Sequence, residues 1–107
     1  MAETRWDKLA KDLAECGFEV RVDEQPYTES RNARIVHGVS RSITYRVKGK
    51  GLVTIDDAYH RYTESWVGYR VTAEGLDSII IGTPSRATKS RSETVAMFRL
   101  ALANVEG

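Results

Sequence analysis

The spacing of apolar residues predicts an amphipathic helix close to the N-terminus. Its apolar positions recur every three or four residues, with charged residues between them, and are Trp6, Leu9, Ala10, Leu13 and Cys16. Thr4, with Asp7 three residues later, is typical of a capping arrangement at the helix start. Gly17 suits a left-handed end, and Phe18 supplies the apolar residue that often follows one.

A second helix is expected from Ser90, which forms a capping-box pattern with Glu93. Its main buried stripe is predicted to contain Val95, Phe98, Ala101, Leu102 and Val105. Apolar residues also lie outside that stripe, at Ala96, Met97, Leu100 and Ala103. A helix that is apolar on most of its circumference needs cover on more than one side. Either the chain itself covers both sides, or Met97 and Leu100 belong to a partner interface.

Between the helices the apolar period changes from 3.6 to 2, which indicates strands with one buried face. Alternation predicts strands over residues 18–23, 42–48, 52–56 and 66–72, and the apolar run 78–82 is typical of a fully buried strand. Glycines at 49 and 51 permit a tight hairpin. Residues 24–34 have loop composition, and 33–39 is interpreted as a short edge strand. The whole is a single domain, residues 1–107. We predict an α+β two-layer sandwich with the order α-β-β-β-β(-β)-α, in which both helices cover one face of an antiparallel meander.

The composition is that of an ordinary globular domain, with 41% hydrophobic and 29% charged residues. Cys16 is the single cysteine, so no disulfide framework within the chain is possible. The start of the sequence has no basic segment followed by an apolar one, and the longest apolar runs are too short for a membrane span. These features favour a cytoplasmic protein with no membrane partner.

Charge is distributed unevenly along the chain, although the net charge is only +1. Residues 30–55 carry six Lys and Arg and no acid, and residues 79–92 carry three and no acid. The segments around them are acidic. Clusters of one sign suggest an anionic partner if they meet in space.

Candidate anion-binding residues follow from these two segments: Arg46, Lys48, Lys50, Arg86, Lys89 and Arg91. The second group precedes a helix N-terminus, where backbone N–H groups and the helix dipole favour a phosphate. Trp66 is expected on the water-facing side of the sheet with several cations, an arrangement that single-stranded nucleic-acid platforms use for base stacking. The alternative interpretation is that these are solvated strand faces and a plain loop, since exposed Lys and Arg also protect sheet edges.

Catalytic and metal-binding interpretations find little support. Asp56, Asp57, His60 and Glu64 lie close together in sequence, but adjacent residues on a strand point to opposite faces. Two histidines and one cysteine do not supply the ligands of a structural zinc site. Cys16 is expected to be buried on the apolar side of the first helix. We therefore predict no catalytic residues, no metal and no cofactor.

Two functions remain open. The first is a non-enzymatic domain that binds nucleic acid or an acidic protein surface through its basic segments. The second is a protein-interaction module, such as an adaptor, a dimeric chaperone-like protein or an inhibitor, phage-encoded or accessory in type, that uses the apolar face of the second helix. A homodimer is compatible with both, because it joins two basic faces.

Overall fold

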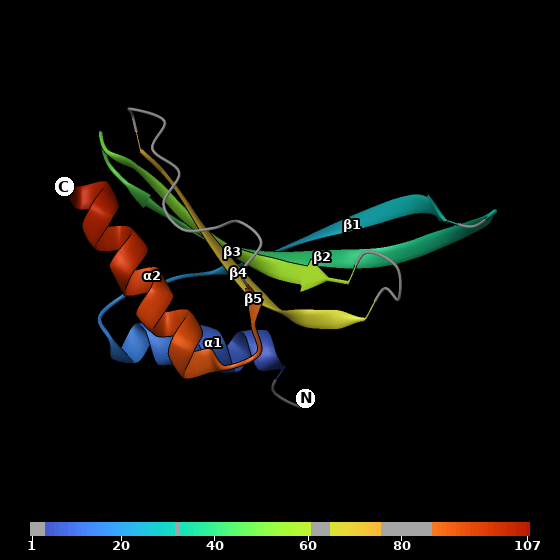
Figure 1. Ribbon diagram of the computed structural model, residues 1–107, viewed down its shortest axis with the longest axis horizontal. Helices are drawn as coiled ribbons and strands as arrows, with labels where there is room; N and C mark the ends of the chain where they lie inside the picture. Colours follow the sequence, from blue (N-terminus) through green and yellow to red (C-terminus); the bar gives the residue numbers. More distant parts are fainter. Residues whose placement is uncertain (1–3, 32, 61–64, 76–86) are drawn as a thin grey trace.

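The described helices and strands follow the predicted order. The computed structural model describes residues 4–31, 33–60, 65–75 and 87–107. The elements are α1 (Arg5–Glu15), β1 (Val22–Arg31), β2 (Arg34–Val47), β3 (Gly51–Tyr59), β4 (Trp66–Gly75), β5 (Ala87–Thr88) and α2 (Arg91–Glu106). The described strands form one antiparallel sheet in the order β1-β2-β3-β4-β5, and both helices lie on the same face of it (Figure 1). The predicted α+β class is confirmed.

Both ends of α1 follow the sequence signals. The Thr4 hydroxyl accepts from the Asp7 N–H at 3.2 Å, and the Asp7 carboxylate accepts from the Thr4 N–H at 3.0 Å. These Thr4 hydrogen bonds hold the pKa of Asp7 below its usual value because they favour the carboxylate. At the other end Gly17 has φ 91°, and the Phe18 N–H donates to the Leu13 carbonyl at 2.9 Å. This is a Schellman ending.

The start of α2 differs in one detail from a capping box. The Ser90 hydroxyl accepts from the Glu93 N–H at 3.2 Å, as predicted. The Glu93 carboxylate, however, accepts from the Thr88 hydroxyl at 2.6 Å, and the Thr88 oxygen accepts from the Ser90 N–H at 3.1 Å. The Thr88 hydroxyl therefore bridges the Ser90 N–H and the Glu93 carboxylate, which hydrogen-bond directly in a capping box, and this contact joins β5 to the helix start.

The core lies between the two helices and the sheet. Its largest buried side chains include Trp6, Tyr69 and Phe98. The buried α2 residues are Thr94, Phe98, Ala101, Leu102 and Val105. This confirms four positions of the predicted stripe, while Val95 is only half-buried against the core.

Several local predictions were wrong. Residues 24–31, expected as a loop, belong to β1, whereas 18–21 lie before the strand. The expected edge strand at 33–39 and the strand at 42–48 form one element, because β2 runs without a break from Arg34 to Val47. Cys16 is exposed, since it is the C-cap of α1 and lies past the buried stripe. The predicted strand at 78–82 lies outside the described residues.

The β1–β2 hairpin extends beyond the helix-covered part of the sheet. Pairing between β1 and β2 runs from Val22↔Ile43 to Arg31↔Arg34, but β2 pairs with β3 only over residues 42–47. Among the described strands, residues 34–41 therefore pair with β1 alone. We call residues 24–31 and 34–41 the arm. It projects away from α1 and α2 (Figure 1), in a molecule of 46 × 35 × 22 Å.

Candidate functional site

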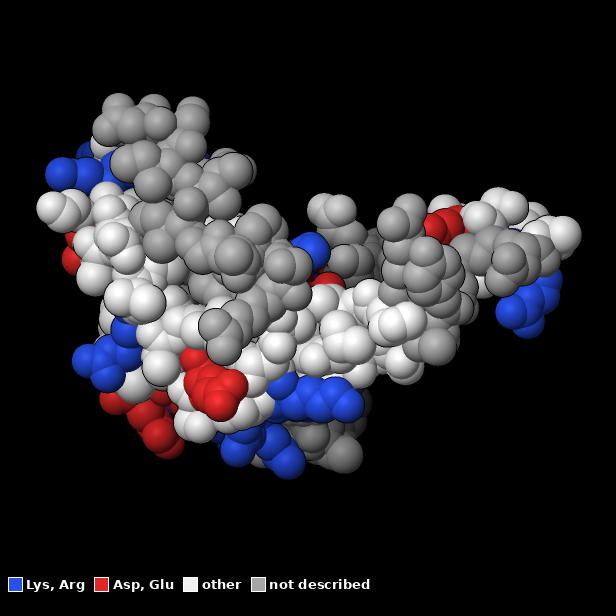
Figure 2. Space-filling model, viewed as in Figure 1, with Lys and Arg blue, Asp and Glu red and all other residues white. Residues whose placement is uncertain are grey.

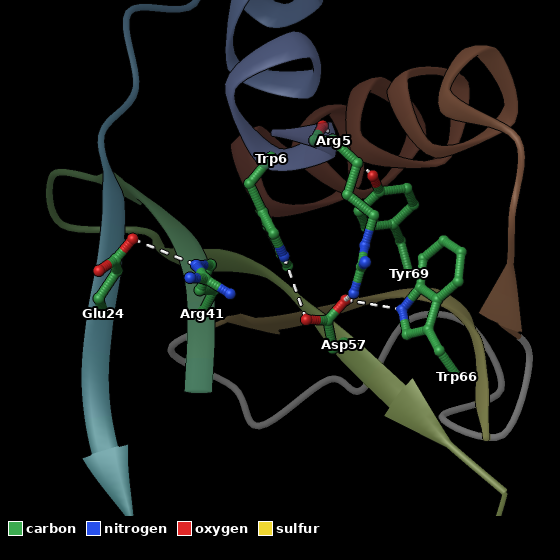
Figure 3. A network of polar contacts seen from close by, with 7 residues as sticks. All are labelled: Arg5, Trp6, Glu24, Arg41, Asp57, Trp66 and Tyr69. Carbon is green, nitrogen blue, oxygen red and sulfur yellow. Dashed lines mark hydrogen bonds and ion pairs between the residues drawn. The ribbon is translucent and has the colours of Figure 1, made fainter. Parts of the chain in front are cut away.

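A carboxylate on the helix-covered face of the sheet accepts hydrogen bonds from three side chains of α1 and β4 (Figure 3). Asp57 of β3 accepts from the Trp6 indole at 3.1 Å, from the Trp66 indole at 2.7 Å and from Arg5 at 3.4 Å. The Asp57 side chain is only 9% exposed. A nearly buried carboxylate is costly without partners, so these hydrogen bonds offset the cost of burying Asp57.

Aromatic rings pack around this carboxylate. The Tyr69 ring contacts both Trp6 and Trp66 edge to face, with centroids 5.3 Å apart in each pair. The Arg5 guanidinium lies 4.1 Å from the Trp66 ring centroid, a cation–π distance. Burial raises the pKa of the Tyr69 hydroxyl, which donates to the Arg5 carbonyl at 3.3 Å. The cluster ties the start of α1 to β3 and β4.

A bulge places Trp66 in this cluster. The β3–β4 register shifts between Ala58 and Tyr59, and Trp66 pairs with Tyr59 two residues before the Gly68↔Ala58 pair. Gly68, with φ 137°, lies against the backbone of Thr88 in β5. The shift breaks the alternation, so Trp66 and Tyr69 share the helix-covered face. The predicted position of Trp66 on the water-facing side was wrong for this reason, and base stacking on Trp66 stays a prediction.

The neighbouring acid points to the other face, as the strand period predicts. Asp56 accepts two hydrogen bonds from Arg70 of β4, at 2.8 and 3.1 Å. This pairing raises the pKa of Arg70. The His60 N–H donates to the Ser65 carbonyl at 2.8 Å. Glu64 lies outside the described residues. The described acids of this segment thus face different partners and do not converge on one point.

The first group of predicted anion-binding residues lies at the β2–β3 hairpin. Arg46 ends the exposed side of β2, and Lys48 and Lys50 occupy the turn, all three exposed. Gly49 has φ 74° and Gly51 has φ 148°, as expected for a tight turn. The hairpin therefore presents three cations to water within five residues.

The second group is placed less favourably for an anion. Lys89 is exposed, but Arg91 lies 3.4 Å from the Asp12 carboxylate of α1. Asp12 and Glu15 line the same shallow groove as Arg91, together with Ser90, Ser92, Val95 and Cys16. Arg86 lies outside the described residues. Acidic side chains thus share the groove at the start of α2.

The described members of the two basic groups lie apart. β5 pairs with β4 at Tyr69 and Arg70, in the middle of that strand, whereas Gly51 beside the hairpin pairs with Gly75 at its end. Five residues of strand span roughly 17 Å. Figure 2 shows Lys and Arg side chains in separate groups on one face of the molecule, with acidic side chains among them.

The two residues predicted as a partner interface on α2 behave differently. Met97 is half-buried and packs against the core. Leu100 is 65% exposed. Ala96 and Ala103, the other apolar residues outside the main stripe, are also exposed. Among the residues that the structure describes, the chain therefore covers only Met97 on the second apolar side of α2.

The exposed apolar side chains gather instead at the arm, which the sequence reasoning missed. Ile35 is 70% exposed, Val39 44% and Tyr27 37%, and Tyr59 at the end of β3 is 53% exposed. The sequence did indicate apolar residues here: Ile35, Val36 and Val39 are three apolar residues in a segment interpreted as a short edge strand. Residues 24–34 have a polar composition that resembles a loop, so the strand that pairs with residues 34–41 was not predicted.

A groove of about 320 Å³ lies where the arm separates from β3. Pairing of β2 with β3 stops at Ser42↔Asp56, and the two strands diverge beyond it (Figure 1). The groove is lined by aromatic, aliphatic and acidic residues: Tyr27, Glu29, Val39, Ser40, Asp57 and Tyr59. We call this groove the notch.

Neither described helix has the length and apolar character needed to cross a membrane. The chain matches no protein-family model, no curated protein and no solved structure at a significant level.

Proposed function

We propose that this chain is a non-enzymatic protein-binding domain and that the arm is its binding surface. The observation that carries the proposal is the exposure of Ile35 and Val39 on a ribbon that β3 and the helices leave uncovered. Isolated two-stranded ribbons are marginally stable in water, and exposed apolar groups on them gain from a partner. A strand edge also offers a partner main-chain hydrogen bonds.

The charges of the arm favour a protein over a polyanion. Arg41 lies 3.1 Å from the Glu24 carboxylate across the two strands. With Glu29, Arg31 and Arg34, the arm carries three cations and two acids. A surface of mixed sign lacks the excess of cations from which nucleic-acid affinity is built.

A capture experiment with two matched variants tests this function. The chain and its Ile35→Ser/Val39→Ser variant are immobilised and exposed to nuclease-treated native lysate, with Leu100→Ser as the control for an exposed apolar residue elsewhere. A protein that the wild type and Leu100→Ser both retain, and the arm variant does not, is the expected result. Loss with Leu100→Ser alone would assign the interface to α2 and contradict the proposal.

A second candidate function is the binding of an anionic partner by Arg46, Lys48 and Lys50, together with Lys89 and Arg91. It is supported by the three exposed cations of the β2–β3 hairpin. If the partner is nucleic acid, affinity falls with salt by a log–log slope of about 0.9 per phosphate contacted. Changing the three hairpin cations to Glu is expected to abolish binding. Unchanged binding in that variant, or a slope near zero, would end this candidate.

A further inference from the structure

We propose that the arm binds a second copy of this chain, by pairing the open edge of β2 with the same edge of its partner around a two-fold axis at His37. This inference rests on the proposed function of the arm, because it names the occupant of that surface. Three features of the arm carry it: which edge is open, which side chains lie along that edge, and what the notch would receive.

Pro26 determines which edge of the arm can accept a strand. It lies opposite Val39 in the β1–β2 register. Residues opposite each other in an antiparallel pair either exchange both hydrogen bonds or neither. Proline has no N–H and is confined to positions whose nitrogen faces away from the neighbouring strand. Pro26 thus interrupts the outer edge of β1, while Val39 directs its N–H and C=O to the open edge of β2.

The same direction applies to alternate residues of β2. His37 and Ile35 lie two and four residues before Val39 on β2. Because backbone direction alternates along a strand, their N–H and C=O groups also face the open edge. Among the described strands, none pairs with these three residues from that side. This edge therefore offers three residues whose donors and acceptors a further antiparallel strand would satisfy.

The side chains along this edge are self-complementary. A two-fold axis at His37 places Ile35 of one copy opposite Val39 of the other, twice, on one face of the joined ribbon. Ile35 is 70% and Val39 44% exposed in the single chain. Cross-strand pairs of β-branched residues stabilise antiparallel sheets. One patch on each copy thus covers the same patch on the other, as an isologous interface requires.

The notch supplies acidic and aromatic side chains at both ends of the paired strands. The same axis places Arg34 of one copy opposite Ser40 of the other. Ser40 lines the notch together with Tyr27, Glu29 and Asp57. The Arg34 guanidinium of one copy would thus arrive among acidic and aromatic side chains of the other, beside an Asp57 that already accepts from Arg5 and two indoles.

Site-directed disulfide formation tests the register directly. In a Cys16→Ser background, His37→Cys places two thiols on the two-fold axis, with Cα atoms about 5.5 Å apart, within the roughly 4.4–6.8 Å that a disulfide spans. Thr28→Cys is the matched control, because Thr28 lies opposite His37 on β1 and is also exposed. Under mild oxidation we expect His37→Cys to become covalent dimer and Thr28→Cys to remain monomer. Equal cross-linking of both variants, or of neither, would overturn the proposal.

Sedimentation of the reduced wild-type chain provides the second measurement. Its mass is expected to rise with concentration from 12.0 kDa to twice that value, and Ile35→Lys/Val39→Lys is expected to stay monomeric with an unchanged circular dichroism spectrum. A wild type that stays monomeric at the highest attainable concentration, or a dimer that survives both lysines, would overturn the self-pairing. In either case a lysate protein lost only by the arm variant would still support the broader function, so the two failures are distinguishable.

Discussion

The helix-covered half of the sheet and the arm share strands β1 and β2 but differ in how far their side chains are buried. In the covered half Asp57 is only 9% exposed and accepts from two indoles. In the arm Ile35 is 70% exposed, and the described pairing of residues 34–41 is with β1 alone. The covered half thus contains the contacts that determine the fold, whereas the arm has backbone groups and apolar side chains available for another molecule.

Removing a large side chain from each region is expected to give the largest difference. Trp6 is 1% exposed and donates to Asp57, so Trp6→Ala is expected to lower the free energy of unfolding by about 3–5 kcal/mol. Ile35→Ala is expected to change it by less than about 0.5 kcal/mol. Urea unfolding of the dissociated chain measures both. Similar losses in the two variants would contradict the division into two regions.

A methyl group added at a glycine of each region gives the next contrast. Gly68 has φ 137°, and a Cβ there would meet the backbone of Thr88, so Gly68→Ala is expected to cost about 1–3 kcal/mol and to release β5. At Gly38 a Cβ would meet only the end of the exposed Tyr27 side chain, which can move. Thermal unfolding is expected to show a clear loss for Gly68→Ala and little change for Gly38→Ala; the reverse order would show that the Tyr27 contact is rigid.

Neutralising one carboxylate in each region separates a buried acceptor from an exposed one. Asp57→Asn replaces an acceptor oxygen with an NH₂ group that faces the indole and Arg5 donors, which is expected to cost about 1–3 kcal/mol. Glu24→Gln affects an ion pair with Arg41 in which both side chains are substantially exposed, and is expected to cost no more than about 1 kcal/mol. Chemical denaturation of the two variants side by side checks the order, and a larger loss from Glu24→Gln would reverse our assignment of the two sites.

The smallest expected effect concerns alkaline pH. Burial raises the pKa of Tyr69 above its ordinary value, so its contribution to stability is fully present below about pH 10, the unfolded value, and is lost as pH rises through the folded one. Tyr69→Phe is expected to cost about 1 kcal/mol at neutral pH and to remove this part of the alkaline loss. Tyr59→Phe, at an exposed position, is the control. An identical alkaline profile in the wild type and Tyr69→Phe would contradict the burial of this hydroxyl.

The sequence predicted the fold well where one side of an element is buried. The helix period and the Thr4 and Ser90 caps identified both helices, because burial imposes the period and free backbone N–H groups require caps. Residues 24–31 were misinterpreted because both faces of that strand meet water. Without a buried face no hydrophobic alternation is selected, and Pro26 with polar neighbours resembles a loop.

The candidate sites were harder to predict, because they depend on register and local irregularity. The bulge beside Tyr59 moves Trp66 onto the helix-covered face. Gly68 inside the strand pattern is a signal for a bulge, but it does not give the register. The two basic segments are prominent in the sequence, but strand pairing places β5 beside the middle of β4 and the β2–β3 hairpin beside its end. The arm could have been suspected from Ile35 and Val39, yet their exposure depends on where pairing with β3 stops.

Amide hydrogen exchange at two protein concentrations tests the central claim most directly. The amides of Val53 and Ile55 in the core are expected to exchange slowly at both concentrations, whereas those of Ile35, His37 and Val39 exchange quickly in dilute protein and slowly in concentrated protein. If the three arm amides are already as slow as those of the core in dilute protein, the arm is part of the cooperative fold. That result would contradict its assignment as a surface reserved for a partner.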